Sequence, residues 1–175
     1  GENHLDGGLF QNNDMEIRIG ANGTFKHVTK DGSLLVLDNL NASTSGGSIV
    51  LGNEDELLLS SQYSSSKIAA NLVGNGWLFL ENLSSDGENV DAWELSGNNS
   101  GWGGVIAAFG NGAKINLNSA SAGSSSSSIN FGALGNLNVN ESTRLGNLDF
   151  DNNLTVNVAS GKTFSIDKGL TSNIR

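Results

Sequence analysis

Two carboxylates near the end of the chain have a spacing that suits acid–base chemistry. Asp149 and Asp151 flank Phe150, so on a β-strand both carboxylates would face solvent and the ring would point inward. Clustered aspartates on such a face act as acid and base in glycan cleavage, or they bind calcium. The same triplet also fits a plain solvated face beside a core phenylalanine. We therefore keep Asp149 and Asp151 only as candidates for ligand binding.

Other side chains that could act in catalysis are scarce. The chain has two histidines, His4 and His27, and no cysteine. A hydrolase triad needs a histidine beside a nucleophilic serine, but His4 falls in an expected tail and His27 in a polar strand. The acidic run at 54–56 lacks the alternating spacing of a calcium loop, and no phosphate-binding or HExxH sequence occurs. We predict a protein that is not an enzyme and has no catalytic residue, metal site or cofactor.

The three tryptophans could form a platform for sugar rings. Trp77 and Trp93 lie in apolar runs, which indicates packing in the core or at a cap. Trp102 lies between glycines, and we expect it to be the most exposed of the three. Trp102 is therefore a third candidate for ligand binding. Two serine-rich segments, Ser60–Ser66 and Ser119–Ser128, are predicted to be flexible loops.

The composition excludes several classes of protein. Asn, Ser and Gly account for 25, 24 and 24 of the 175 residues, and Pro is absent. A net charge of −9 at pH 7 repels phosphate, so we expect no nucleic-acid partner. No apolar run approaches the roughly 18 residues of a membrane helix. We therefore expect no membrane insertion by this segment.

Short runs that alternate apolar and polar residues recur along the chain. Gly, Asn, Asp and Ser separate them and favour turns, and the same residues are poor helix formers. Period-two alternation puts one apolar face opposite one polar face, as in Leu-Thr-Val-Asn-Val at 154–158. We predict strands at Met15–Ile19, Thr24–Val28, Leu34–Leu37, Ser48–Leu51, Glu56–Ser60, Lys67–Val73, Trp77–Leu80, Ala92–Leu95, Gly104–Ala108, Lys114–Leu117, Ser128–Phe131, Asn136–Val139, Asn147–Phe150, Leu154–Val158 and Thr163–Ile166.

Two all-β architectures fit these strands. An antiparallel β-sandwich would use the Asn-Gly and Asp-Gly pairs as hairpin turns. A single-stranded parallel β-helix, or solenoid, suits the low charge, the Asn-rich surface and the lack of proline, so we favour it. At about 20–25 residues per coil, the chain would form about seven or eight coils. We expect residues 1–14 to be an N-terminal tail or cap and residues 15–175 to be the solenoid.

One segment, Trp93–Leu117, resembles a known repeat. Its sequence is similar to the autotransporter-associated β-strand repeat, in which a strand ending in Leu-Ser-Gly is followed by asparagines, an aromatic residue, paired glycines and a second strand. After Gly104 the usual Thr-rich strand is replaced by Val-Ile-Ala-Ala-Phe. The matching residues are Leu95-Ser96-Gly97-Asn98-Asn99, Trp102, Gly103-Gly104, Val105-Ile106 and Gly112.

This resemblance implies a segment of a longer autotransporter passenger, displayed on the surface of a Gram-negative bacterium or secreted from it. Such passengers are right-handed parallel β-helices, and many are adhesins. The expected partners are a host-cell surface protein, a glycan, or a second copy of the chain. Two alternatives remain open: a β-helical carbohydrate-active enzyme that uses Asp149 and Asp151, and a non-catalytic spacer or toxin-passenger segment.

Overall fold

The computed structural model describes residues 48–53, 55–61, 66–82 and 92–173, together with four earlier strands. All regular structure in these residues is β-strand, which confirms the all-β prediction. The predicted strand Met15–Ile19 lies outside the described residues. The four earlier strands are β1 (Glu2–Asp6), β2 (Phe10–Asn12), β3 (Thr24–Val28) and β4 (Leu34–Leu37).

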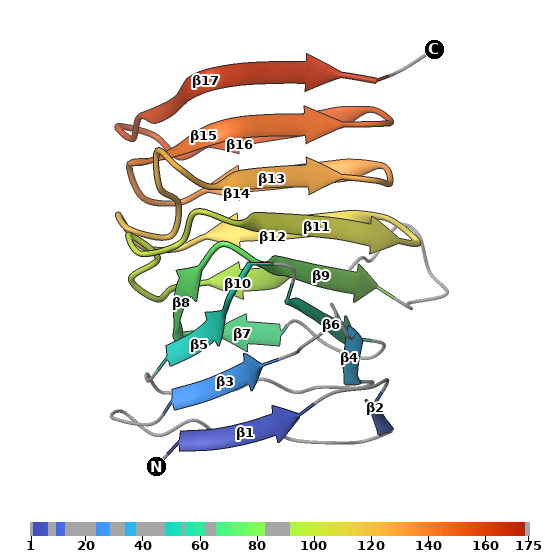
Figure 1. Cartoon of the computed structure of the whole chain (residues 1–175). Helices are drawn as coiled ribbons and strands as arrows, with labels where there is room; N and C mark the ends of the chain where they lie inside the picture. Colours follow the sequence, from blue (N-terminus) through green and yellow to red (C-terminus); the bar gives the residue numbers. More distant parts are fainter. Residues whose placement is uncertain are drawn as a thin grey trace.

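Three parallel sheets run along the molecule (Figure 1). The longest has eight strands: β2, β4, β6 (Glu56–Ser61), β9 (Trp77–Asn82), β11 (Val105–Gly110), β13 (Ser128–Phe131), β15 (Thr143–Phe150) and β17 (Phe164–Ser172). The second has five: β7 (Ser66–Ile68), β10 (Trp93–Leu95), β12 (Ala113–Leu117), β14 (Gly135–Val139) and β16 (Leu154–Val158). The third has four: β1, β3, β5 (Ser48–Leu51) and β8 (Asn71–Gly74).

The chain first alternates between the four-stranded and eight-stranded sheets and, after β8, between the eight-stranded and five-stranded sheets, and successive strands stack in parallel, which makes the molecule a parallel β-solenoid. Ala113 pairs with Gly135, and Val105 with Ser128, so one coil takes 22 or 23 residues there. The two ends of the chain lie at opposite ends of the stack (Figure 1). Because all the strand pairs are parallel in the part of the chain that the structure describes, the alternative of an antiparallel sandwich is wrong.

The solenoid has about five coils, fewer than the seven or eight that we predicted. The eight-stranded sheet continues along the stack, whereas the four-stranded sheet ends at β8 and the five-stranded sheet begins at β7. Dividing the chain length by one period ignores such differences between the sheets. Residues 1–14, the expected tail or cap, contain β1 and β2, which pair with β3 and β4 respectively.

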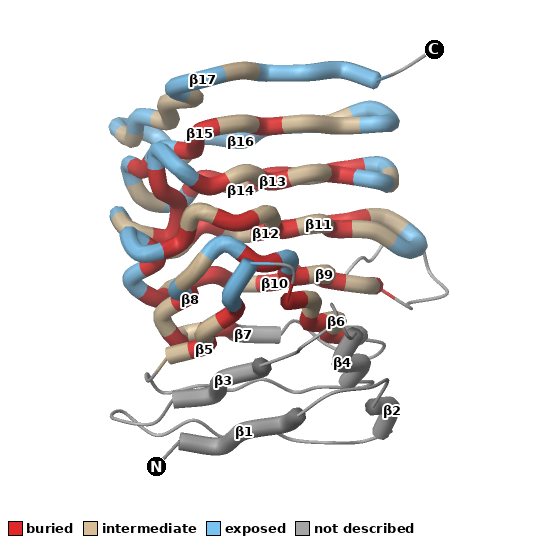
Figure 2. Tube along the Cα trace, in the orientation of Figure 1, coloured by how far each residue is buried: buried red, intermediate tan, exposed pale blue. Residues whose placement is uncertain are grey.

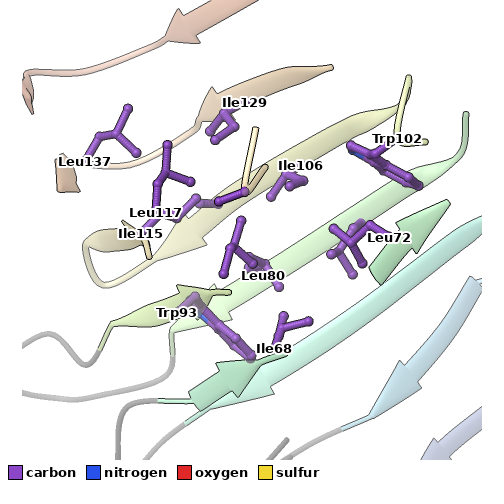
Figure 3. Packing of buried hydrophobic residues seen from close by; sticks show 14 of the residues in the cluster. Ile68, Leu72, Leu80, Trp93, Trp102, Ile106, Ile115, Leu117, Ile129 and Leu137 are labelled. Atoms are coloured by element: carbon purple, nitrogen blue, oxygen red, sulfur yellow. The ribbon is translucent and has the colours of Figure 1, made fainter. Parts of the chain in front are cut away.

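The core runs along the axis of the solenoid and is built by alternation. In β12 and β14 every second residue is buried, and Figure 2 shows buried and partly exposed positions alternating along the strands. In the eight-stranded sheet, Ile106 pairs with Leu78 on one side and Ile129 on the other, and all three are buried. Figure 3 shows how such side chains fill the interior. Each fully buried Leu or Ile contributes roughly 1.5–3 kcal/mol.

The C-terminal end of this core is uncovered. Val156, Val158 and Leu170 stand in register with the buried residues of the preceding coil, but they are themselves exposed, Leu170 by 61%. β16 and β17 are the last strands of their sheets, and β17 is largely exposed in Figure 2. The last described coil is therefore covered on one side only.

Candidate functional site

The segment that resembles the autotransporter repeat forms a tightly packed corner, Gly97–Gly104. Asn99 is buried in it and is 1% exposed. Its Oδ1 accepts a hydrogen bond from the backbone N–H of Leu72 at 2.8 Å, and its Nδ2 donates one to the carbonyl oxygen of Ala122 at 3.0 Å. Asn99 therefore connects the coil before it with the coil after it.

Two glycines allow this corner to lie directly against the preceding coil. A Cβ atom on Gly97 would lie 2.2 Å from the carbonyl oxygen of Ala70, and one on Gly104 would lie 2.1 Å from that of Gly76. Neither distance is possible for a side-chain carbon, so only glycine fits at either position. Packing between coils thus explains Gly97, Asn99 and Gly104 of the repeat.

Trp93 is buried as expected, but Trp77 and Trp102 do not have the exposures that we expected. Trp102, the expected surface residue, is 1% exposed, and Trp93 is 2% exposed. Trp77, which we placed in the core, is 40% exposed. Glycine at position 104 leaves room for the indole of Trp102, because a Cβ there would lie 2.7 Å from the ring. Trp102 is buried in the interior, where a ligand at the surface does not reach it.

The serine-rich segment Ser119–Ser128 is not the flexible loop that we predicted. Its small side chains let it lie against the preceding corner, and its hydroxyls bond to backbone carbonyls there. Ser119 Oγ donates to Gly97 O at 2.9 Å, and Ser124 Oγ donates to Trp102 O at 2.7 Å. The other predicted loop, Ser60–Ser66, lies partly outside the described residues.

The candidate carboxylates lie at the C-terminal end of β15, and only Asp149 is on the outer face of the eight-stranded sheet. Asp149 is half-buried on β15, while Asp151 is exposed in the turn that follows. Asp151 Oδ1 accepts a hydrogen bond from Asn173 Nδ2 at 2.9 Å. Phe150 packs against the core, as the alternation predicted. In the described part of the chain, no group of three or more His, Cys, Asp or Glu side chains is arranged to hold a metal ion.

The remaining candidates are the two histidines and the acidic run at 54–56. His4 lies on β1 and His27 on β3, but their side chains are outside the description. Glu54 also lies outside the described residues. Asp55 is buried, and its Oδ2 accepts the backbone N–H of Gly52 at 2.7 Å. This bond closes a turn, so at Asp55 the acidic run has a structural role.

Stacked asparagines form an asparagine ladder on the outer face of the five-stranded sheet. Asn138 Nδ2 donates to Asn116 Oδ1 at 2.7 Å, and Asn157 Nδ2 donates to Asn138 Oδ1 at 2.9 Å. At the next corner, Asn140 Nδ2 donates to Asn118 Oδ1 at 2.7 Å. Each coil therefore presents amide groups at the same place as its neighbour.

Three rings form an aromatic row on the outer face of the eight-stranded sheet: Trp77, Phe79 and Phe109. The rings of Trp77 and Phe79 are nearly parallel, with centroids 5.8 Å apart and an angle of 16° between their planes. Phe109, on the neighbouring strand, meets Phe79 edge-on at 6.3 Å and 82°. The sequence does not predict this row, because Trp-Leu-Phe-Leu at 77–80 is apolar at every position and its pattern does not tell which face is outside.

Comparison of the chain with models of known protein families, with curated proteins and with solved structures gives no match in any of the three. In the described residues, no helix is long and apolar enough to span a membrane.

Proposed function

We propose that this chain is an adhesive, non-catalytic segment of a longer autotransporter passenger, wound as a right-handed β-helix at the surface of a Gram-negative bacterium. Its partners are a host-cell surface protein or glycan, or a second copy of the chain. The observation that carries the proposal is the regular repetition of hydrogen-bonding side chains on the outer face of a stack of parallel strands. The resemblance at Trp93–Leu117 supports the assignment to an autotransporter passenger.

The outer face of the five-stranded sheet illustrates how such a surface would bind. Lys114 and Asn116 of β12 stand in register with Asn136 and Asn138 of β14, and these with the outward residues of β16. Neighbouring strands lie about 4.8 Å apart, so equivalent polar groups repeat at that interval. Many weak hydrogen bonds from such an array add up to strong attachment, because all of them form at once.

The test uses beads coated with the purified chain. Attachment to cultured epithelial cells and clumping of the beads are measured for the unmodified chain and for three double variants, each of which adds negative charge to one surface. The five-stranded face receives Lys114→Glu and Thr155→Glu. The serine-rich segment Ser119–Ser128 receives Ala120→Glu and Ser125→Glu, both at exposed positions. The eight-stranded face receives Val105→Glu and Thr171→Glu.

We expect the unmodified beads to attach or clump, and at least one variant to lose this behaviour several-fold while keeping its far-UV circular dichroism spectrum. Equal behaviour of all three variants and the unmodified chain would contradict a binding role for these faces. Unmodified beads that neither attach nor clump would contradict adhesion itself.

The non-catalytic part of the proposal has its own test. A panel of plant, bacterial and animal polysaccharides is incubated with the chain, and the release of reducing ends is measured. We expect none. Cleavage that disappears in the double variant Asp149→Asn and Asp151→Asn would instead establish a carbohydrate-active enzyme.

A further inference from the structure

We infer that Asn111 is a site of spontaneous chemical modification, at which the side-chain amide is lost through attack by the backbone nitrogen of Gly112. The turn that contains both residues joins β11 to β12, and so connects the eight-stranded sheet to the five-stranded sheet. The inference does not depend on the proposed adhesive function, because the reaction needs no partner other than water.

The reaction has two steps and oxidises or reduces nothing. The backbone nitrogen of Gly112 gives its proton to solvent and bonds to Cγ of Asn111, while the Cγ–Nδ2 bond breaks and Nδ2 leaves as ammonia with a proton from water. The product is a cyclic succinimide. Water then opens this ring at either of its carbonyls, which leaves aspartate or isoaspartate at position 111. Because a carboxylate is ionised at neutral pH, the turn gains a negative charge.

The attacking nitrogen makes no hydrogen bond in the folded chain. On either side of it, Asn111 N donates to Asn82 O at 3.0 Å, and Ala113 N donates to Leu134 O at 2.9 Å. Between them, the N–H of Gly112 has no acceptor in the part of the chain that the structure describes. No bond therefore has to break before this nitrogen can react.

The backbone of the turn also suits ring closure. Asn111 is exposed and Gly112 is partly exposed. Gly112 has a φ of 99°, in the left-handed region that glycine enters and leaves at little cost. Since glycine carries no side chain, nothing on Gly112 itself shields its nitrogen from Cγ of Asn111.

A second Asn-Gly pair, Asn75-Gly76, provides a comparison within the same chain. Its glycine is buried, and the N–H of Gly76 donates to Leu51 O at 3.3 Å. A Cβ on Gly76 would lie 2.6 Å from the carbonyl oxygen of Asp55, so this backbone is packed against the preceding coil. Reaction at Asn75 requires that contact to open first. The same pair of residues therefore occurs in one reactive turn and one protected turn.

The test follows both sites in the purified chain during incubation at mildly alkaline pH and physiological temperature. Chymotrypsin cleaves after Phe, Trp, Tyr and Leu, so it releases residues 110–117 and 73–77 as separate peptides. Mass spectrometry of each peptide measures the replacement of the amide by a hydroxyl group, and fragmentation locates it. We expect conversion at Asn111 to be at least about tenfold faster than at Asn75, a difference of about 1.4 kcal/mol in the barrier, and to become faster as the pH rises.

Two controls separate the effect of the fold from that of the sequence. In guanidinium chloride, which unfolds the chain, both asparagines are still followed by glycine and should react at similar rates. Asn111→Gln keeps an amide in the turn, but its longer side chain closes a ring much more slowly. Conversion at position 111 should therefore disappear in this variant, while Asn75 behaves as before. Circular dichroism confirms that the variant is folded.

The inference would be overturned by equal rates at the two sites in the folded chain, by faster conversion at Asn75, or by a folded chain that does not react at Asn111 while the unfolded chain does. A difference between the sites that persists in guanidinium chloride would assign it to the flanking sequence instead of the turn. Aspartate without isoaspartate would exclude the cyclic intermediate, because ring opening gives both. An endoproteinase that cleaves before aspartate but not before isoaspartate distinguishes the two products.

Discussion

Asn99 shows how a single polar side chain can fix the packing of three successive coils. It is buried, and its amide group bonds to Leu72 on one side and to Ala122 on the other. A buried amide with both ends satisfied stabilises a fold, whereas the backbone groups left behind after its removal lose their partners. Its identity is therefore tied to its position between coils.

Replacing this residue should be costly. We expect Asn99→Ala to lower the free energy of unfolding by about 2–6 kcal/mol, because two buried backbone groups lose their partners at about 1–3 kcal/mol each. Asn98→Ala is the control, since Asn98 is exposed and its Oδ1 accepts the nearby N–H of Ser100. Urea unfolding of both variants measures the difference; an equal loss in the two would contradict the assigned role.

At the residue scale, the alternation of apolar and polar residues predicts the two faces of a strand well. It does not predict which of the tryptophans are buried. The inward position of Phe150 followed from simple alternation. The burial of Trp102 depends on the space beside Gly104, which belongs to the contact between two coils and cannot be seen in local sequence. The exposure of Trp77 depends on which face of a wholly apolar strand turns inward.

At the scale of the elements, the corners decide whether successive coils can approach. The backbone at Gly97 lies against the carbonyl of Ala70, whereas a Cβ on Gly101 in the same corner would make an ordinary van der Waals contact, 3.7 Å from the side chain of Val73. Replacing each of these two glycines by alanine should therefore have different effects on stability.

We expect Gly97→Ala to destabilise the protein by about 3 kcal/mol, since the new methyl group must push two backbone segments apart. Gly101→Ala should change stability by no more than about 0.5 kcal/mol. The melting temperatures of the two variants provide the comparison. A harmless alanine at position 97 would show that the coils are not in contact at this corner.

The asparagine ladder should contribute less, because it faces solvent. Asn138 makes one side-chain bond to the strand before it and one to the strand after it. We expect Asn138→Ala to lower the unfolding free energy by about 1–2 kcal/mol, with each bond worth about 0.5–1.5 kcal/mol. Thr155→Ala on the same face is the control and should cost less. Denaturant unfolding distinguishes them, and equal losses would show that the ladder bonds add nothing.

Most strands were predictable because period-two alternation is a local pattern. The bounds at Ser48–Leu51, Ser128–Phe131 and Leu154–Val158 agree with the sequence prediction. The predicted strand Lys67–Val73 instead divides into β7 and β8, because the chain turns a corner at Ala69 and Ala70. Corners were harder because Ser119–Ser128 resembles a linker in composition, although hydrogen bonds to a neighbouring coil order it.

At the scale of the whole molecule, the coils differ in length, but their register gives a defined point at which one coil can be removed. Paired residues are separated by as few as 19 positions, from Ser128 to Asn147, and as many as 28, from Trp77 to Val105. Ala113 stands in register with Gly135, so deletion of residues 113–134 joins Gly112 to an equivalent point one coil later.

The chain without residues 113–134 should still fold cooperatively. Its unfolding free energy should fall by about 1–3 kcal/mol, given about 0.05–0.15 kcal/mol per residue. Deleting only residues 113–123 is the control; it removes part of a coil, breaks the register and should abolish cooperative unfolding. Circular dichroism during thermal unfolding compares the two. Loss of folding in the full-coil deletion would contradict the assumption that adjacent coils are interchangeable.

In the purified 175-residue chain, the exposed last coil should open before the central coils. β16 and β17 each have one paired neighbour among the described strands, while β11 and β13 each have two. In hydrogen–deuterium exchange, amide protons of the last coil should exchange through local fraying, and those of the central coils only through much larger opening. The solenoid should thus show protection that rises from its open end toward its middle.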